Sequence, residues 1–347
     1  MPAITSGRVL VTGGSGFLAL YVIRALLERG FSVRYTVRSE SKAAFVDALF
    51  KEHAARLEAV IVADMALPGA YDAAVPGVDG IVHVASPVDV TNAGAPELVT
   101  GPAVGGVTGL AESVAAHGGA LKRWVQVSSV GALGADFTQG AAYAEADWND
   151  ESVRVCAELG AGAEGIHKYN ASKVLAERAF WAAAAGASWD GVSVLPSMIM
   201  APELQYALSG ASVGLGLGLA PLVAGGISES QLGDVAPWHI VDARDVGHVV
   251  VAALTTPEAG GERFIASNGI LSLNDVALAA GGAFDNVVQA NPDPAFAAAL
   301  PAKSYVVDGS KAERVLGFTY RPVRETLEDT LASVPREVFA PAPAAQS

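Results

Sequence analysis

The sequence predicts an α/β fold built on a doubly wound parallel sheet. Short apolar segments alternate with longer segments of helical apolar periodicity from residue 8 to residue 195. This alternation is typical of parallel strands joined by crossover helices. The 347 residues, of which 51% are hydrophobic, allow one large or two moderate domains and a substantial core. We therefore expect a globular protein whose first part contains the sheet.

The N-terminal segments predict a β-α-β unit. Residues 8–12 form a short apolar strand, residues 13–16 a glycine-rich turn, and residues 17–29 a helix with an apolar stripe. Gly30 follows at the position where a left-handed residue commonly ends a helix. A second strand at residues 32–37 completes the unit, so the two strands should be parallel and the crossover right-handed.

The remaining elements fall into two parts of the chain. Further strands of the sheet are expected at residues 59–62, 80–84, 124–128 and 191–195. After Pro196 the alternation stops, and we expect a strand at 238–241, a helix at 243–254 and a strand at 263–266. The rest, to about residue 334, predicts a smaller C-terminal lobe, and we expect the Ala- and Pro-rich tail 335–347 to be disordered.

Composition and charge exclude several classes of function. The net charge of -14 argues against a nucleic acid or an anionic membrane as the main partner. The single cysteine, Cys156, excludes an intrachain disulfide, and we expect an inert thiol in a reducing compartment, with the cytosol as the default. Residues 207–227 carry no charge over the length of a membrane span. Their many glycines disfavour a helix, so we expect a pliable apolar pocket wall instead.

The turn after the first strand has the pattern of a phosphate-binding loop. Residues 12–19, Thr-Gly-Gly-Ser-Gly-Phe-Leu-Ala, fit Gly-x-x-Gly-x-x-Ala between a predicted strand and a predicted helix. Glycines let the backbone approach a pyrophosphate, whose charge meets free N–H groups and the positive end of the helix dipole. This pattern predicts a Rossmann-type dinucleotide site with the candidate cofactor contacts Gly13, Ser15, Gly16, Phe17 and Leu18.

The end of the second strand indicates which dinucleotide would bind. NAD-specific sites usually place a carboxylate there, whereas this chain has Arg38 and, shortly after it, Lys42. A guanidinium and an ammonium would pair with a 2′-phosphate, so we expect NADPH. The alternative is that both are solvated surface cations. Asp64 and Met65, after the third strand, are placed to border the adenine.

Tyr169 and Lys173 are four residues apart and would share one face of a helix, which places a proton source beside a cation. A free tyrosine has a pKa of about 10, so a nearby positive charge is one way to make a phenol useful as an acid at neutral pH. Chance also produces this spacing on helices, and the pair gains meaning only together with the other motifs.

With the glycine turn, Ser129 and Tyr169-x-x-x-Lys173 in this order, the chain resembles the extended short-chain dehydrogenase/reductase superfamily. Further similar segments cover nearly the whole chain and lie at residues 79–87, 127–130, 194–196, 241–246 and 310–318. The His-Val-Ala-Ser-Pro run at 83–87 and Tyr-x-Ala-Ser-Lys resemble the branch of dihydroflavonol reductases and fungal NADPH-dependent aldehyde, ketone and methylglyoxal reductases.

The resemblance implies a role for each catalytic residue. Tyr169 would donate a proton to a carbonyl oxygen as hydride arrives from the nicotinamide, and Lys173 would hold the nicotinamide ribose and favour loss of the phenol proton. Ser129 would hydrogen-bond the carbonyl oxygen, and Ser128 would contact the cofactor. The other implied cofactor contacts are Val84, Ala85, Ser86, Pro196, Ser197, Met198 and Ile199.

The resemblance also implies a division of the chain and a kind of substrate. Residues 1–195 with about 236–266 would form the NADP-binding Rossmann domain, and 196–235 with 267–334 the substrate-binding lobe. The candidate substrate-pocket residues are Val88, Val90, Leu133, Tyr206 and Leu208. Since all are apolar or aromatic, a hydrophobic aldehyde or ketone is favoured over a charged substrate.

Other polar residues have simpler interpretations. His83 lies in a strand and is expected to be a core or bracing histidine, and Asp242 and Asp245, beside Arg244, an ion-pair cluster. The six histidines show no metal-ligand spacing, so we expect no metal. The leading hypothesis is an NADPH-dependent carbonyl reductase that gives a chiral alcohol. The alternatives are a nucleotide-sugar epimerase or dehydratase of the same superfamily and a non-catalytic NADP(H)-sensing protein; the oligomeric state is left open.

Overall fold

A seven-stranded parallel sheet organises the chain. The computed structural model describes residues 3–88, 93–135, 139–202, 204, 228, 231–281 and 287–333. The strand order is β10-β7-β5-β4-β1-β2-β3, and every pair is parallel. The strands are β1 (Arg8–Thr12), β2 (Ser32–Val37), β3 (Leu57–Ile61), β4 (Gly80–His83), β5 (Arg123–Val127), β7 (Asp190–Pro196) and β10 (Arg263–Ala266). The predicted fold class is confirmed, and each predicted strand of this sheet is within two residues of its observed ends.

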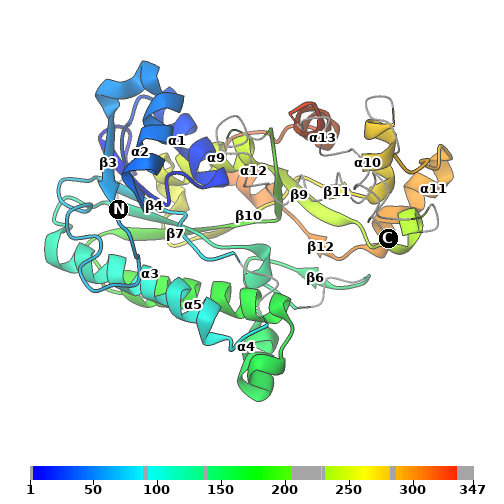
Figure 1. Cartoon of the computed structure of the whole chain (residues 1–347), viewed down its shortest axis with the longest axis horizontal. Helices are drawn as coiled ribbons and strands as arrows, with labels where there is room; N and C mark the ends of the chain where they lie inside the picture. Colours follow the sequence, from blue (N-terminus) through cyan, green and yellow to red (C-terminus); the bar gives the residue numbers. More distant parts are fainter. Residues whose placement is uncertain are drawn as a thin grey trace, which may run out of the picture.

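Helices cover both faces of the sheet (Figure 1). One face carries α1 (Phe17–Glu28), α2 (Glu40–Leu49) and α9 (Ala243–Thr255). The other face carries α3 (Glu97–His117) and α5 (Gly165–Ala184), which pack against each other, and α4 (Asp150–Leu159) packs on α5. Short 3-10 helices connect the elements at η1 (Lys51–Arg56), η2 (Val130–Ala132), η3 (Gly160–Gly162), η5 (Pro257–Ala259) and η6 (Leu300–Lys303).

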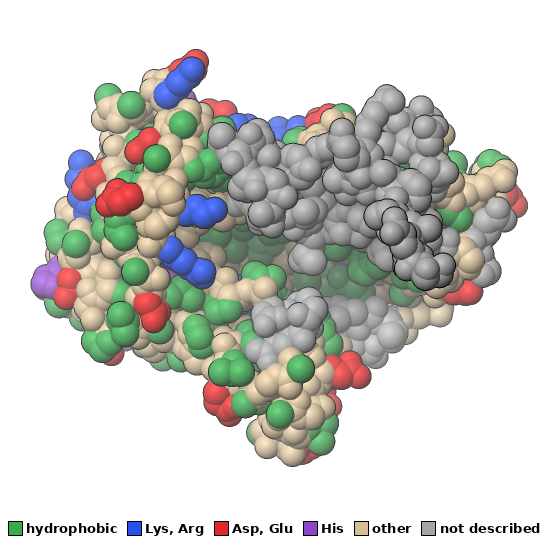
Figure 2. Space-filling view, in the orientation of Figure 1, with side chains coloured by type: hydrophobic (Ala, Val, Ile, Leu, Met, Phe, Trp, Pro, Cys, Tyr) green, Lys and Arg blue, Asp and Glu red, His purple; other side chains and the backbone are tan. Residues whose placement is uncertain are grey.

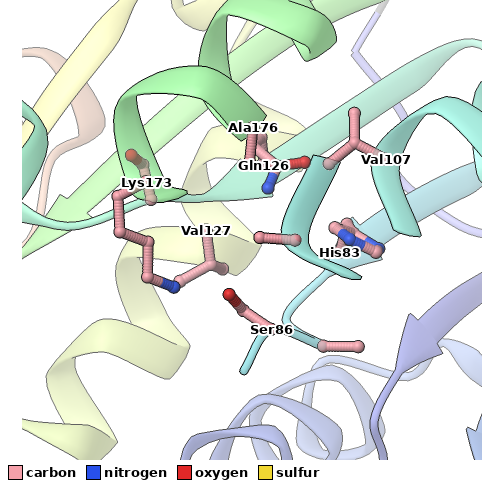
Figure 3. Close-up of a pocket in the computed structure, with 10 residues that line it drawn as sticks. His83, Ser86, Val107, Gln126, Val127, Lys173 and Ala176 are labelled. Carbon is pink, nitrogen blue, oxygen red and sulfur yellow. The ribbon is translucent and has the colours of Figure 1, made fainter. Parts of the chain in front are cut away.

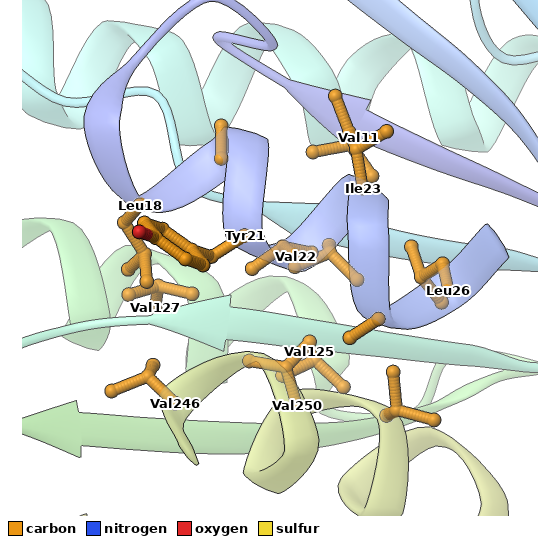
Figure 4. Packing of buried hydrophobic residues seen from close by; sticks show 14 of the residues in the cluster. Val11, Leu18, Tyr21, Val22, Ile23, Leu26, Val125, Val127, Val246 and Val250 are labelled. Atoms are coloured by element: carbon orange, nitrogen blue, oxygen red, sulfur yellow. The ribbon is translucent and has the colours of Figure 1, made fainter. Parts of the chain in front are cut away.

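A cluster of buried apolar side chains packs α1 and α9 onto one face of the sheet (Figure 4). Val22 and Leu26 of α1 and Val125 of β5 are fully buried in one cluster with Val250 of α9. Burying one such side chain contributes about 1.5–3 kcal/mol, so this layer is a major part of the stability. Gly247 makes the helix contact possible, because a Cβ there would lie 3.0 Å from the Tyr21 carbonyl oxygen.

The strand order reverses between β1 and β4, which is the position of ligand sites in open parallel sheets. β1 lies between β2 and β4, and Thr12 and His83 are register partners at the carboxyl ends of the two strands. The glycine turn leaves β1 at this point. The fold therefore places the predicted phosphate loop at the edge of the sheet where a cofactor would enter.

A smaller lobe stands at one end of the molecule (Figure 1). Its three-stranded sheet consists of β8 (Met198–Met200), β9 (Trp238–Asp242) and β11 (Ile270–Leu271), and β6 (Ala142–Tyr143) pairs with β12 (Val306–Val307). Its helices are α8 (Gln231–Asp234), α10 (Leu273–Ala280), α11 (Pro294–Ala299) and α13 (Val323–Ala332), whereas α12 (Ser310–Leu316) packs near β10 and α9. The division into domains stays a prediction, because β9 pairs in the small sheet while α9 packs on the large one.

Ion pairs join the start of α9 to β9, to α13 and to the residue Arg321 before α13. Arg244 contacts Asp242 and Asp329, each at 2.6 Å, and Arg321 pairs with Asp245. The predicted ion-pair cluster is therefore present, and it braces the junction of the two sheets. In the part of the chain that the structure describes, no helix is long and apolar enough to span a bilayer. The segment 207–227 and the tail 335–347 lie outside the described residues.

Candidate active site

The glycine turn is held tightly between the ends of β2 and β4. Gly13 has a φ of +70°, and its N–H donates to the Thr36 side chain at 3.2 Å, while the Gly14 N–H donates to the Thr36 carbonyl at 2.7 Å. A Cβ on Gly14 would lie 2.8 Å from the Tyr35 ring, so no larger residue fits there. Gly16 is the N-cap of α1 and offers no capping side chain, which keeps the first N–H groups of the helix available for an anion.

Thr12 and His83 connect the turn to β4. The Thr12 hydroxyl oxygen accepts from the N–H groups of Val84 and Ala85, both at 3.0 Å, so its own proton goes to Nδ1 of His83, also at 3.0 Å. Burial, with a smaller effect of the Lys173 charge, lowers the pKa of His83 from 6.5 to about 3. The imidazole is thus neutral at physiological pH, and His83 braces the chain as expected. The bonds also fix the first of the cofactor contacts predicted after β4.

The two cations predicted to bind a 2′-phosphate lie after β2 and in α2, and their contact with a phosphate stays a prediction. Arg38 follows β2 directly, Lys42 lies in the first turn of α2, and both are exposed. Among the described residues, neither has a carboxylate partner within ion-pair distance. The Tyr35 hydroxyl donates to Asp47 at 2.6 Å and so holds α2 against β2. Figure 2 shows Lys and Arg side chains at the edge of a central hollow lined by hydrophobic side chains.

Asp64 and Met65, the predicted adenine neighbours, follow β3. Asp64 is exposed and accepts the Ala66 N–H at 2.9 Å through one carboxylate oxygen. Met65 is half-buried against α3, where its sulfur would be 3.2 Å from a Cβ on Gly106. Their contact with adenine stays a prediction.

Ser129 begins the turn after β5. Its hydroxyl oxygen accepts the Gly131 N–H at 3.1 Å and so caps η2, which leaves the O–H proton free to point at another acceptor. Ser128 is buried, and its hydroxyl donates to Glu177 at 2.7 Å. The proton of Ser128 is therefore already engaged, whereas that of half-buried Ser129 is available to a substrate.

Tyr169 and Lys173 lie together on α5, as their spacing predicts. The Lys173 ammonium is 5.5 Å from the centre of the Tyr169 ring. Lys173 is only 7% exposed, and with Ala85, Ser86 and Ser128 it lines one small cavity. In Figure 3 the Lys173 ammonium and the Ser86 side chain face the same space. The fold thus brings together four residues predicted to contact the cofactor from three separate segments.

Asn170, which no sequence motif singled out, lies where α5 meets the Ser129 turn. A Cβ on Gly131 would collide with the Asn170 side-chain oxygen and would be 3.4 Å from the Ser129 oxygen. Asn170 is 1% exposed, and neither side-chain amide atom has a hydrogen-bond partner within the described chain. Gly131 therefore permits the close approach of α5 to the turn. The only sequence signal for Gly131 was its position two residues after Ser129.

The nicotinamide flank predicted after β7 stands at the junction of the two sheets. Pro196 is the last residue of β7, and the Ser197 N–H donates to the Ala266 carbonyl at 2.9 Å. Met198 and Ile199 open β8 and are half-buried. The roles of these residues toward a cofactor stay predictions.

The predicted substrate wall is only partly within the described residues. Val88 is 62% exposed after β4. Leu133 is 1% exposed and packs with Val130 and Val174, so it supports the Ser129 turn from the core and does not line an open pocket. Val90, Tyr206 and Leu208 lie outside the described residues. Tyr143, which no sequence motif singled out, packs closely against Gly134. A Cβ on Gly134 would overlap the Tyr143 ring.

Burial raises the pKa of the Cys156 thiol, which favours its unreactive protonated form. Within the residues that the structure covers, no three His, Cys, Asp or Glu side chains gather as metal ligands would. The absence of a metal nevertheless stays a prediction.

Comparison with known proteins decides the family. The model of the NAD dependent epimerase/dehydratase family matches residues 9–266. The chain belongs to this family. The resemblance to extended short-chain dehydrogenases/reductases is thereby confirmed. The matched residues 9–266 include the glycine turn, Ser129, Tyr169 and Lys173.

Similar proteins of this family carry reductase names. The ketoreductase azaE of Aspergillus niger is 27% identical over 346 residues, or 94% of this chain and 97% of that protein. Tetraketide alpha-pyrone reductase 1 of Arabidopsis thaliana is 31% identical over 333 residues, or 94% and 95% of the two chains. Gre2 of Candida albicans, solved in complex with NADPH, has a TM-score of 0.81 at 23% identity, covering 94% and 98%. The similarity to the Gre2 structure shows that this chain has the same fold.

Proposed function

We propose that this family member reduces a hydrophobic aldehyde or ketone with NADPH and gives a chiral alcohol. The observation that carries the proposal is the pairing of Tyr169 with Lys173, 5.5 Å from ring centre to ammonium, on the helix that packs against the Ser129 turn. Among the described residues, the Ser129 hydroxyl accepts from the Gly131 N–H and its own proton has no acceptor. The reductase names of its relatives support the reaction class, and the NADPH of the Gre2 structure supports the cofactor.

The residues present fit NADPH. The Gly13–Gly16 turn has no room for a side chain at Gly14, as a backbone cradle for pyrophosphate requires, and the uncapped start of α1 adds N–H donors. Arg38 and Lys42 would hold the 2′-phosphate. Asp64 and Met65 would border the adenine. When bound, NADPH supplies the hydride of the reduction.

The chain's own side chains would do the proton chemistry. The Ser129 O–H donates to the substrate carbonyl oxygen, and because its oxygen already accepts from the Gly131 N–H, the hydroxyl is polarised toward donation. Tyr169 delivers its proton to the same oxygen. Lys173 holds a positive charge beside the phenol and stabilises the phenolate that remains. Buried, neutral His83 takes no part in proton transfer.

The test is carbonyl-dependent oxidation of NADPH. The parent protein is assayed with aldehydes, α- and β-keto esters, diketones and flavonoids, with NADPH and with NADH, and the products are resolved on a chiral column. Tyr169→Phe should lower the rate by about a hundredfold or more, as expected for loss of a general acid. Tyr71→Phe is the matched control, because Tyr71 is a buried tyrosine whose hydroxyl has no hydrogen-bond partner among the described residues. A Tyr169→Phe variant as active as the parent contradicts the proposal.

The same assay separates the alternatives. An NAD-dependent nucleotide-sugar epimerase or dehydratase would convert UDP-sugars with NAD⁺ and leave the carbonyl panel untouched, and the exposed Arg38 and Lys42 speak against it. A non-catalytic sensor would bind NADPH without turnover of any substrate.

A further inference from the structure

Glu177 is a fully buried carboxylate one turn beyond Lys173 on α5. It accepts four hydrogen bonds: from the Ser128 hydroxyl at 2.7 Å, from Trp181 at 3.3 Å, and from Nε and Nη2 of Arg263 at 2.7 and 3.1 Å. Its side chain is 0% exposed, and that of Arg263 is 10% exposed. A buried charge of this kind requires a partner, and Arg263 provides it from β10, at the far edge of the sheet.

Arg263 also holds the segment that follows the Ser129 turn. Nη1 of Arg263 donates to the carbonyl oxygens of Glu145 and Asp147, the latter at 2.7 Å, and its guanidinium lies 4.1 Å from the centre of the Trp148 ring. The next residue, Asn149, donates to the carbonyl oxygens of Gly131 and Gly134, both at 2.8 Å. Through these bonds Arg263 and Glu177 connect α5, the end of β5 and the far side of the turn.

We infer that Glu177 and Arg263 form a positioning pair that sets the Ser129 turn against Tyr169 and Lys173. The inference rests on the proposed function for the roles of Ser129, Tyr169 and Lys173. Neither Glu177 nor Arg263 touches the reacting atoms, and both act through Ser128 and the backbone around it. Arg263 also neutralises the carboxylate nearest to Lys173 along α5, so the lysine charge remains directed at the phenol.

The direction of each hydrogen bond makes the pair testable. A carboxylate only accepts and a guanidinium only donates, so Ser128 must donate to Glu177. Glutamine has the same size as glutamate but only one acceptor oxygen, and that oxygen would accept a hydrogen bond from Arg263. The amide NH₂ would then face Ser128 and reverse its hydrogen bond. If Arg263 is also replaced by methionine, its bonds to the Glu145 and Asp147 carbonyl oxygens are lost as well, so the double variant should not restore the turn.

Other charged groups lie near the pair: Lys311 donates to the Arg263 carbonyl oxygen at 2.8 Å, and the Arg178 guanidinium lies 4.9 Å from the centre of the Trp148 ring. Lys173 precedes Glu177 on the same helix, His83 of β4 is neutral, and Glu145 accepts the Ile265 N–H at 3.3 Å. From α3 the small and aliphatic side chains of Ala103 and Val107 line the same cavity as Lys173.

A second buried pair gives the matched control. Arg123 and Asp190 bond through Nε and Nη2, each at 2.8 Å, and the Arg123 side chain is 0% exposed. They occupy the first residues of β5 and β7, at the opposite end of the strands from Ser129. Asp190→Asn removes one charge from a comparable pair, so it reports the general cost of breaking a buried ion pair.

Steady-state kinetics on Glu177→Gln, Glu177→Gln/Arg263→Met and Asp190→Asn tests the inference. Glu177→Gln should lower kcat by about tenfold or more, as misplaced catalytic groups do, with KM for NADPH within about twofold. The double variant should lose at least as much kcat as Glu177→Gln, because it also lacks the bonds of Arg263 to Glu145 and Asp147. Asp190→Asn should lower Tm and keep kcat. A kcat loss matched by Asp190→Asn, or recovery of kcat in the double variant, overturns the inference.

Amide hydrogen exchange provides a readout that needs no turnover. The peptide covering residues 128–134 should exchange faster in Glu177→Gln than in the parent, and at the parent rate in Asp190→Asn. Unchanged exchange there in Glu177→Gln overturns the positioning role. If the parent reduces no carbonyl compound, the proposed function fails, and the exchange result still decides whether the pair holds the turn.

Discussion

The Thr12 hydroxyl and the His83 imidazole are joined by a 3.0 Å hydrogen bond between β1 and β4, at the point where the strand order reverses. Because the same hydroxyl also accepts two backbone N–H groups, one small side chain fixes the chain that leaves β4 toward the cofactor site. This bond makes the glycine turn and the residues after His83 one rigid unit.

Thr12→Val should destabilise the protein and weaken NADPH binding. The variant keeps the shape of the side chain but leaves the Val84 and Ala85 N–H groups without their acceptor, at a cost of about 1–3 kcal/mol for each buried group. Urea unfolding measures the stability, and fluorescence titration measures the affinity. Thr12→Ser retains the hydroxyl and is the control. Equal stability of the valine and serine variants would show that the hydroxyl is dispensable.

Stability should fall in acid partly through His83. Its pKa in the folded state is lowered from 6.5 to about 3, so above pH 6.5 the neutral ring is the same in both states. Below pH 6.5 the His83 side chain binds a proton in the unfolded chain but stays neutral in the folded protein. The free energy of unfolding therefore falls by about 1.4 kcal/mol for each pH unit between 6.5 and the folded pKa. Urea unfolding at pH 7, 6 and 5 should show a steeper loss in the parent than in His83→Gln. Parallel curves would contradict the neutral buried histidine.

Arg38→Ala and Lys42→Ala should reduce the preference for NADPH over NADH. A charge-assisted hydrogen bond to phosphate contributes about 1.5–3 kcal/mol, so the ratio of the two Kd values should change by about tenfold or more for Arg38. Affinity for NADH should hardly change, since it lacks the 2′-phosphate. Arg29→Ala removes another exposed arginine, at the end of α1, and should leave the ratio at its parent value. An unaltered ratio in Arg38→Ala removes this cofactor assignment.

Gly131→Ala should impair catalysis without loss of the fold. The added Cβ meets the Asn170 side chain and must shift the Ser129 turn away from α5, with a fall in kcat of about tenfold. Asn170→Ala in the same chain makes room and should restore part of kcat. Gly119→Ala has nothing within 4 Å of the new Cβ and is the control. If Gly131→Ala matches the parent in kcat, the close packing of the turn has no catalytic importance.

Local patterns predicted most elements well. The strands at 32–37 and 263–266 have the expected bounds, and the Tyr169 and Lys173 side chains meet as a spacing of four residues on a helix requires. Periodicity and turn chemistry depend on neighbours along the chain, so they can be recognised in a single sequence. Short strands such as β6 and β12, with two residues each, have no such pattern and form because their partners are brought to them.

Leu133 illustrates the limit of this reasoning for the site. Its position after Ser129 and its apolar side chain suggested a pocket wall, yet the structure buries it against Val130 and Val174. Apolar character predicts burial but not whether the burying surface is a ligand or the core.

Patterns along the chain predict the doubly wound sheet, the glycine turn, the cations after β2, and the serine, tyrosine and lysine of the candidate site. How these groups are held depends on contacts between distant parts of the chain. Thr12 and His83 are 71 residues apart, and Glu177 and Arg263 are 86 residues apart. Such pairs depend on strand order and register, which arise from packing of the whole chain, and no local pattern along the sequence encodes them.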